Sequence, residues 1–350
     1  MIEVTGLSKR YGTHLAVENV SFSIDKGEVV GFLGPNGAGK STIMNILTGY
    51  LSLTQGKVEI DGFDIVENPE EAKRRIGYLP EIPPLYIDMK VKEYLGFIYD
   101  LKKVKFPKGP HIDEIMRVVK IDGVKNRLIK NLSKGYRQRV GFAQALIGNP
   151  DVLILDEPTV GLDPKQIIEI RNLIGKLGKN HTIILSSHIL SEIQAVCKRV
   201  IIINKGQIIA DDTPDSLSYK LSSDHSLVAR IACNEDDMLA ALSSVKGVKR
   251  VTSLGKKESG AYDFNIVPEE GEDIRAAVFK RVAERGKTLL SLSSNDISLE
   301  QIFLRLTEAA DNDEARRMLG LQTDDEVTVE EAPPIEIEIV EAEEKEEVEE

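Results

Sequence analysis

The chain has 350 residues, 41% of them hydrophobic, which is enough for two domains with substantial cores and a tail. The net charge of −12 is localised, because residues 321–350 carry 14 acidic side chains and one lysine, a balance of −13 that leaves +1 for residues 1–320. A nearly neutral body excludes a broad basic surface for nucleic acid, and the apolar runs are shorter than the ~20 residues of a membrane-spanning helix.

Two kinds of strand are expected near the N-terminus. Alternating segments in residues 1–30 and 56–66, with turns at 25–27 and 61–62, predict a small antiparallel sheet. The apolar run Gly27–Leu33 follows a turn and predicts a buried strand beside that sheet.

A glycine-rich loop follows that strand at once and matches the pattern G-x-x-x-x-G-K-[ST]. Helical spacing follows over residues 41–47, and Gly49 stands where a helix end often needs a left-handed residue. In this context backbone N–H groups wrap nucleotide phosphates. Lys40 is expected to reach the β- and γ-phosphates, and the Ser41 hydroxyl to reach Mg²⁺. The predicted nucleotide-binding residues of the loop are Gly34, Pro35, Asn36, Gly37, Ala38, Gly39, Lys40, Ser41 and Thr42.

A second helix start with an anion-binding character lies further along, in a lysine-rich helical insertion expected over residues 82–148. Ser133 is a good N-cap, Gly135 is beside it, and Gly148 with Pro150 is a good stop. A chain with one phosphate loop does not need a second anion-binding helix end. The feature makes sense if this end covers the nucleotide that is bound by a second copy.

Two adjacent carboxylates follow the apolar run Val152–Leu155, which predicts a central parallel strand. Ligands bind at the carboxyl ends of such strands. Because neighbouring strand residues point to opposite sides, Asp156 and Glu157 are expected to do different work. Asp156 suits Mg²⁺ through water, and Glu157 suits a general base for the attacking water. The alternative is a pair of carboxylates that only cap a turn.

The pattern changes near residue 216. A hairpin over residues 199–210 closes the first unit, and the order βαββαβ that follows fits a small ferredoxin-like α+β domain over residues 216–310, with a last helix from Ser298. No clustered ligands mark this domain, so a regulatory or dimer-supporting role and a purely structural one both stay open. Residues 311–350 are charged and lack aromatics, which predicts a disordered acidic tail.

In combination, these segments resemble the ATP-binding subunits of ABC transporters over roughly residues 1–215. The loop matches Walker A, Leu132–Gln138 the LSGGQ-type signature, and Val152–Glu157 Walker B. The resemblance implies an α/β P-loop NTPase (RecA-like) core with an antiparallel β subdomain and the helical insertion. It adds four residues: Tyr11 for adenine stacking, Asp163 of the D-loop, the switch residue His188, and Glu81 as a Mg²⁺ contact where most members carry glutamine.

Lys134, Tyr136 and Glu81 depart from the common motifs in a way that resembles the ABC-2 exporter branch. The resemblance implies an ATPase that uses ATP and Mg²⁺, pairs with a second copy or a similar chain, and docks on a separate transmembrane permease near Glu81. It would then lie on the cytoplasmic face of the cell membrane. The alternative is a soluble ABC-type ATPase that acts as a nucleotide-dependent interaction switch without transport.

Overall fold

The structure is a computed structural model that describes residues 1–221, 226–258, 260–269, 272–294, 300–301 and 303–304, with the backbone alone at 218–221 and 294. The predicted tail and the predicted helix start at Ser298 lie outside these residues. The division of the chain into domains at about residues 215 and 310 stays a prediction.

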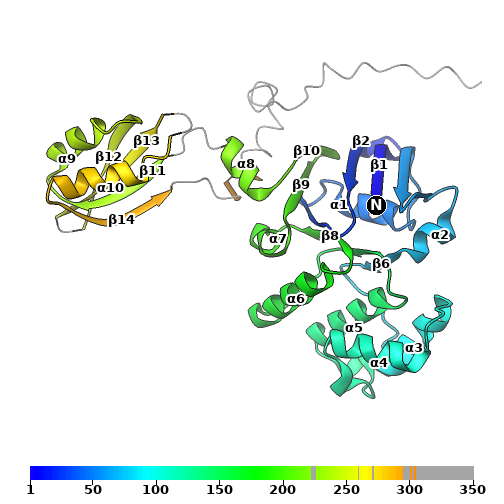
Figure 1. Cartoon of the computed structure of the whole chain (residues 1–350). Helices are drawn as coiled ribbons and strands as arrows, with labels where there is room; N and C mark the ends of the chain where they lie inside the picture. The colour runs from blue at the N-terminus through cyan, green and yellow to red at the C-terminus, as the bar shows by residue number, and fades with distance from the viewer. Residues whose placement is uncertain (222–225, 259, 270–271, 295–299, 302, 305–350) are drawn as a thin grey trace, which may run out of the picture.

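A six-stranded sheet forms the centre of the N-terminal part, in the order β10-β9-β3-β8-β7-β6 (Figure 1). All its strands run parallel except β10, which forms an antiparallel hairpin with β9 through Lys205 and Gly206, both at positive φ. The predicted central strand is confirmed, because β7 lies between β8 and β6. The bounds are β3 Val29–Leu33, β6 Ile76–Leu79, β7 Val152–Leu155, β8 Thr182–Ser187, β9 Arg199–Asn204 and β10 Gln207–Asp212.

The predicted antiparallel sheet is also present and has the order β2-β1-β4-β5. It packs on one face of the central sheet together with helix α1, where alternate strand residues such as Phe32, Ile154 and Ile184 meet Val4, Val17 and Ile43. The bounds are β1 Ile2–Tyr11, β2 His14–Ile24, β4 Gln55–Ile60, β5 Phe63–Asp64 and α1 Lys40–Leu47.

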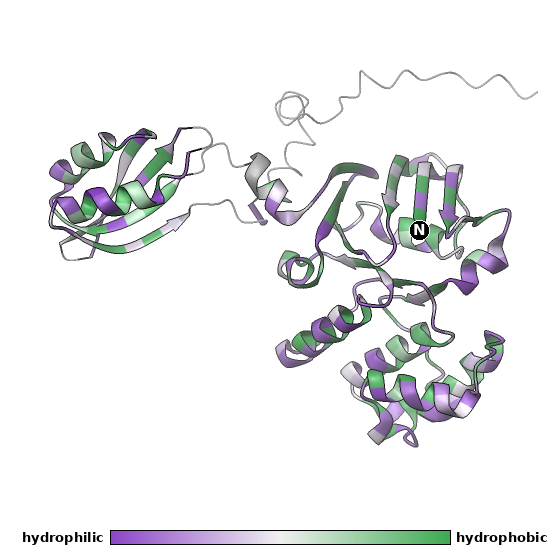
Figure 2. Ribbon diagram, in the orientation of Figure 1, coloured by the Kyte–Doolittle hydropathy of each residue, from purple (hydrophilic) through white to green (hydrophobic). Residues whose placement is uncertain are grey.

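Helices cover the opposite face of the central sheet. The strand residues that point to this side, among them Leu153, Leu155 and Leu185, join one apolar cluster with the helical insertion and with α6 and α7. Green and purple residues alternate along these helices, as an amphipathic face requires (Figure 2). The bounds are α3 Val91–Leu101, α4 Lys108–Val118, α5 Lys134–Leu146, α6 Pro164–Leu177, α7 Leu190–Val196 and α8 Pro214–Leu221, with 3₁₀ turns Asp122–Val124 and Ile129–Asn131. Helix α2, Pro69–Arg74, lies on the other side, where its Ala72 joins the apolar cluster of the antiparallel sheet.

The C-terminal part has its own four-stranded antiparallel sheet in the order β12-β13-β11-β14. The chain order β11, α9, β12, β13, α10, β14 is the predicted βαββαβ. Both helices contribute to one apolar cluster with the strands, for example Leu242 and Val278 with Phe264. The bounds are β11 Leu227–Ala232, α9 Glu235–Ser243, β12 Val248–Glu258, β13 Ala261–Pro268, α10 Arg275–Glu284 and β14 Thr288–Ser294.

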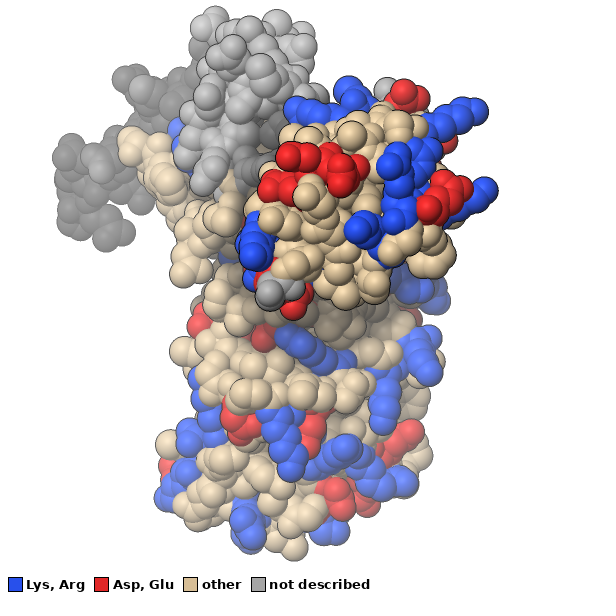
Figure 3. Space-filling view, turned by 90° about the vertical axis from the view of Figure 1, so that its left-hand side faces the viewer, with Lys and Arg blue, Asp and Glu red and all other residues tan. Residues whose placement is uncertain are grey.

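Charge is mixed over the surface. Figure 3 shows basic and acidic side chains interspersed on the face in view, as expected for a body whose residues 1–320 sum to +1. In the described part of the chain, no helix is long and apolar enough to cross a membrane.

Candidate nucleotide-binding and catalytic site

The site lies at the carboxyl edge of three neighbouring parallel strands. The phosphate loop follows β3, Asp156 and Glu157 follow β7, and His188 follows β8, which lies between the other two strands. Because parallel strands end at the same edge, this order brings together segments that are more than a hundred residues apart in sequence.

The phosphate loop turns sharply before α1. Gly37 and Gly39 have φ of +83° and +104°, which a residue with a Cβ rarely adopts. A Cβ on Gly39 would lie 2.8 Å from the Ala16 carbonyl oxygen, whereas around Gly37 the space is open. The Lys40 ammonium lies over the loop and donates to the carbonyl oxygens of Gly34 (2.7 Å) and Pro35 (3.1 Å). Burial lowers the pKa of Lys40, and the nearby carboxylates of Glu157 and Asp156 partly offset that effect.

Asp156 is nearly buried and its orientation is fixed from the neighbouring strand. The Ser186 hydroxyl donates to Asp156 Oδ1 at 2.5 Å and accepts from the Glu157 backbone N–H at 2.9 Å. One serine of β8 therefore positions both carboxylate residues. The expected alternation of Asp156 and Glu157 along a strand is wrong in detail, because β7 ends at Leu155 and Glu157 has φ +46°. A left-handed turn, rather than the pleat, separates the two side chains.

Glu157 and His188 form a pair. His188 Nδ1 lies 2.9 Å from Glu157 Oε2, with the His188 side chain about half exposed and the Glu157 side chain 11% exposed. Burial raises the pKa of Glu157 above its ordinary 4.5, while the charge and hydrogen bond of His188 and the charge of Lys40 act against that rise. A carboxylate with a raised pKa, held by an imidazole, is suited to accept a proton from water.

The second helix end is anchored on the segment that follows the carboxylates. Ser133 is exposed and caps α5 by accepting from the Tyr136 N–H at 3.4 Å, as predicted. Gln138 Nε2 donates to the Pro158 carbonyl at 3.0 Å. A Cβ on Gly135 would lie 2.5 Å from the Gln166 side chain. The exposed N-terminus of α5 is thus held in a fixed place relative to residues 158–166.

Three predicted site residues lie further out. Tyr11 ends β1 and is 46% exposed, with the Lys9 ammonium 5.3 Å from its ring. Asp163 caps α6 by accepting from the Gln166 N–H at 2.9 Å. Glu81 is exposed, two residues beyond β6, and among the described residues no hydrogen bond or ion pair is found for its side chain. In the described part of the chain no hydrogen bond joins Glu81 to Asp156 or Ser41, and its role as a Mg²⁺ contact stays a prediction.

Two further residues were missed by the sequence reasoning. Ser186 was not among the predicted site residues, although it orients Asp156. Glu192 is 3% exposed and accepts from Ser187, and it also forms a close hydrogen bond with Thr159, which ties the segment after His188 to the segment after Glu157. A weak signal was available for Ser186, since a polar residue on a buried strand next to His188 needs a partner.

The geometry fits a nucleotide with its magnesium ion. The open space around Gly37 and the N–H groups at the start of α1 form an anion cradle. Mg²⁺ is usually held by one or two carboxylates together with substrate phosphates and water. Asp156 and Ser41 offer such oxygen atoms, and no cluster of three metal-binding side chains is present in the described residues.

Comparison with known proteins agrees with this geometry. The family model for ABC transporters matches residues 17–160. The bacitracin transport ATP-binding protein BcrA of Bacillus licheniformis is 40% identical over 222 residues, which are 63% of this chain and 72% of that protein. The linearmycin resistance ATP-binding protein LnrL of Bacillus subtilis is 31% identical over 313 residues, 88% of this chain and 98% of that protein.

Solved structures show the same architecture. A dimeric ATP-binding cassette in a post-hydrolysis state, bound to ADP and Pi, aligns with a TM-score of 0.56 at 26% identity and covers 61% of this chain and 98% of that one. The similarity to LnrL extends over nearly the whole of both chains, and the resemblance drawn from the motifs is confirmed. The chain therefore belongs to the ATP-binding proteins of ABC transporters, as an ATP-hydrolysing subunit of a membrane transporter.

Proposed function

We propose that this subunit drives an exporter, in which ATP binding closes a pair of ATP-binding subunits and hydrolysis reopens it. The observation that carries the proposal is the division of the site. Lys40, Asp156, Glu157 and His188 meet at one sheet edge, while the exposed N-terminus of α5 is held on residues 158–166. Each half suits one side of an ATP that is shared by two subunits.

Within one half, each residue has a distinct role. Lys40 and the loop N–H groups bind the phosphates. Asp156 and Ser41 would hold Mg²⁺, which when bound would supply positive charge beside the transferred phosphoryl group. Glu157 accepts the proton of the attacking water. His188 Nδ1 lies 2.9 Å from Glu157 Oε2, and His188 also contacts the γ-phosphate. Loss of the γ-phosphate therefore acts directly on the segment that leads to α7. Tyr11 stacks on adenine.

The other half comes from the second subunit. Ser133 and the N–H groups at the start of α5 bind the γ-phosphate from the opposite side, and Asp163 lies at the same interface. The γ-phosphate then contributes directly to closure, because closing is favoured only while both halves can bind it. A second copy of this chain is the simplest partner, and a similar ATP-binding chain would serve equally.

Export is supported by the relatives, whose names state bacitracin transport and linearmycin resistance. The membrane subunit would dock beside Glu81, on the cytoplasmic face of the membrane. Large apolar side chains are exposed next to this position: Ile82 (82%), Tyr86 (56%) and Phe97 (39%), with the rings of Tyr86 and Phe97 5.4 Å apart. Exposed apolar side chains gathered in one place mark an interaction surface.

Glu157→Gln tests the proposed chemistry. The variant should bind ATP, turn over slower by ~10²–10⁴, the usual contribution of a positioned base, and accumulate an ATP-bound dimer in size-exclusion chromatography. Glu67→Gln is the matched control, since Glu67 is exposed and its side chain has no hydrogen bond or ion pair among the described residues. Normal hydrolysis by Glu157→Gln would remove Glu157 from this role.

Capture from native membranes separates transport from the alternative of a switch without transport. The tagged chain should retain a multi-span membrane protein, and Tyr86→Asp should release it. Leu254→Asp, a change at another exposed apolar residue (49%), should not. Retention that is equal for both variants would argue against docking beside Glu81.

A further inference from the structure

A groove on the helical side of the ATPase body is lined by several cations, three of which have no side-chain partner among the residues that the structure describes. It consists of two adjoining hollows, of about 660 and 770 Å³, which share Lys120 and Lys176. The first hollow also contains Arg171 and Asn172 and is lined by no acidic residue. The second is lined by Arg117, which donates to the Asp113 carbonyl oxygen, and by a single carboxylate residue, Glu114. We refer to the two hollows together as the basic groove.

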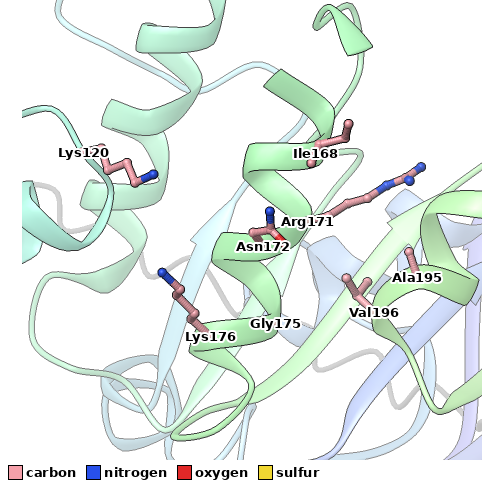
Figure 4. A pocket seen from close by; sticks show the side chains of 8 residues that line it. All are labelled: Lys120, Ile168, Arg171, Asn172, Gly175, Lys176, Ala195 and Val196. Carbon is pink, nitrogen blue, oxygen red and sulfur yellow. The ribbon is translucent and has the colours of Figure 1, made fainter. Parts of the chain in front are cut away.

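The walls of the basic groove come from two parts of the body. Lys120 follows α4 in the helical insertion, whereas Arg171 and Lys176 lie on α6, which follows the D-loop of the nucleotide core. Figure 4 shows the ammonium groups of Lys120 and Lys176 pointing into the space between their elements, with Arg171 on the α7 side, near Ala195 and Val196. An occupant would therefore contact the insertion and the core at once.

Arg171 is unusual among the arginines of this protein. Elsewhere the buried or half-buried arginines are paired, as Arg139 is with Glu169 and Arg199 with Asp211. Within the described residues, no hydrogen bond or ion pair is found for the side chains of Lys120, Arg171 or Lys176, and the Arg171 Nε is buried without an acceptor. Such a donor has lost its hydrogen bond to water and has gained no acceptor from the protein. A carboxylate would supply the missing acceptor.

The same chain carries the complementary charge. Residues 321–350 sum to −13, whereas residues 1–320 sum to +1. The last described helical residues return to the ATPase body, because Phe303 packs against the apolar cluster that contains α6 and α7 residues. The 16 residues from 305 to 320 can span up to ~50 Å, against a radius of gyration of ~17 Å for a domain of this size, so the acidic segment can reach the groove.

We propose that the acidic segment 321–350 of the chain docks in the basic groove. Its carboxylates pair with Lys120, Lys176 and Arg171, and thereby join the helical insertion to α6. The binding is electrostatic and side-chain based, so it needs no particular backbone structure in the tail, and it weakens as salt screens the charges.

Zero-length carbodiimide coupling of the full-length protein tests the docking. The reagent joins a carboxylate to an amine only where the two are in contact, and peptide mass mapping locates each amide. We expect amides between the segment 321–350 and Lys120 or Lys176, formed within one chain in an isotope-mixed sample, and lost severalfold at high salt. Arg171→Gln should lower their yield severalfold. The control Lys26→Gln, at an exposed lysine without a partner among the described residues, should not.

Lysine reactivity provides a second measurement that does not depend on a variant of the groove. Replacing the acidic residues of 321–350 by Gln and Asn should raise the acetylation rates of Lys120 and Lys176 severalfold, with Lys26 and Lys246 unchanged. Amides spread evenly over exposed lysines, amides formed only between chains, or acetylation rates that do not change would each overturn the proposal.

Discussion

Ser186 carries a prediction that the motifs alone do not make. Its side chain is fully buried and makes two hydrogen bonds, to the Asp156 carboxylate at 2.5 Å and from the Glu157 N–H at 2.9 Å. Ser186→Ala leaves both groups buried without this partner. A hydrogen bond to a charged group contributes about 1.5–3 kcal/mol and an orphaned buried amide costs about 1–3 kcal/mol, so we expect the free energy of unfolding to fall by about 3 kcal/mol.

The loss of activity should exceed the loss of stability. A residue that orients a metal-binding carboxylate typically contributes about 10–100-fold, and kcat should fall by that factor at temperatures where the variant is fully folded. Ser187→Ala is the matched control. Ser187 is equally buried on the same strand and bonds Glu192 (3.2 Å) and the Ile189 N–H (3.0 Å), but it does not bond Asp156 or Glu157. Steady-state ATPase assays and urea unfolding compare the two. Equal kcat values for the two variants would refute the reasoning.

Three further predictions concern charge and backbone. Burial raises the pKa of Glu157, so the acid limb of the pH profile of kcat should lie above pH 4.5. The protonated carboxyl favours the folded state, and that stabilisation is lost as the pH rises through the raised pKa. Glu157→Gln should therefore have a higher melting temperature than the wild type at neutral pH, and a lower one would contradict this. Gly161→Ala should lower the free energy of unfolding by at least the ~1–2 kcal/mol of a left-handed alanine, because φ is +67° and the Lys134 ammonium would lie 2.0 Å from the added Cβ. Gly175→Ala, in open space on α6, should instead raise it by up to ~1 kcal/mol. Urea titrations that rank the two variants the other way would refute this. Glu81→Gln should strengthen ATP-driven dimerisation in the absence of the permease, because the exposed carboxylate adds negative charge on the phosphate side. If light scattering shows unchanged or weaker dimerisation, Glu81 only replaces the usual glutamine with a side chain of the same geometry.

Local patterns sufficed for much of the fold. The phosphate loop was predictable because its glycines, its strand and its helix are contiguous, and Gly49 takes the left-handed conformation that was expected at the end of α1. The βαββαβ order was predictable because periods of two and of 3.6 residues alternate along residues 226–294. The cap by Ser133 is equally local.

Contacts between distant segments were not predictable in the same way. Ser186 and Asp156 are 30 residues apart, and only the adjacent pairing of β8 with β7 makes the serine a partner of the carboxylate. The conformation of Glu157 differed from the expected pleat because the strand ends before it, and strand ends leave little trace in a sequence. No local pattern in the sequence distinguishes Arg171, and its buried Nε is evident only in the folded structure.

The central claim is that two chains complete each ATP site. Lys40→Ala removes the ammonium of one half, and Ser133→Arg blocks the helix end of the other, so either protein alone should be nearly inactive. In an equal mixture half of the dimers contain both chains, and each of these has one intact site, so the ATPase rate should recover to about a quarter of the wild-type rate. A mixture no more active than the sum of the two separate proteins, or a Ser133→Arg protein with full activity independent of concentration, would contradict the account.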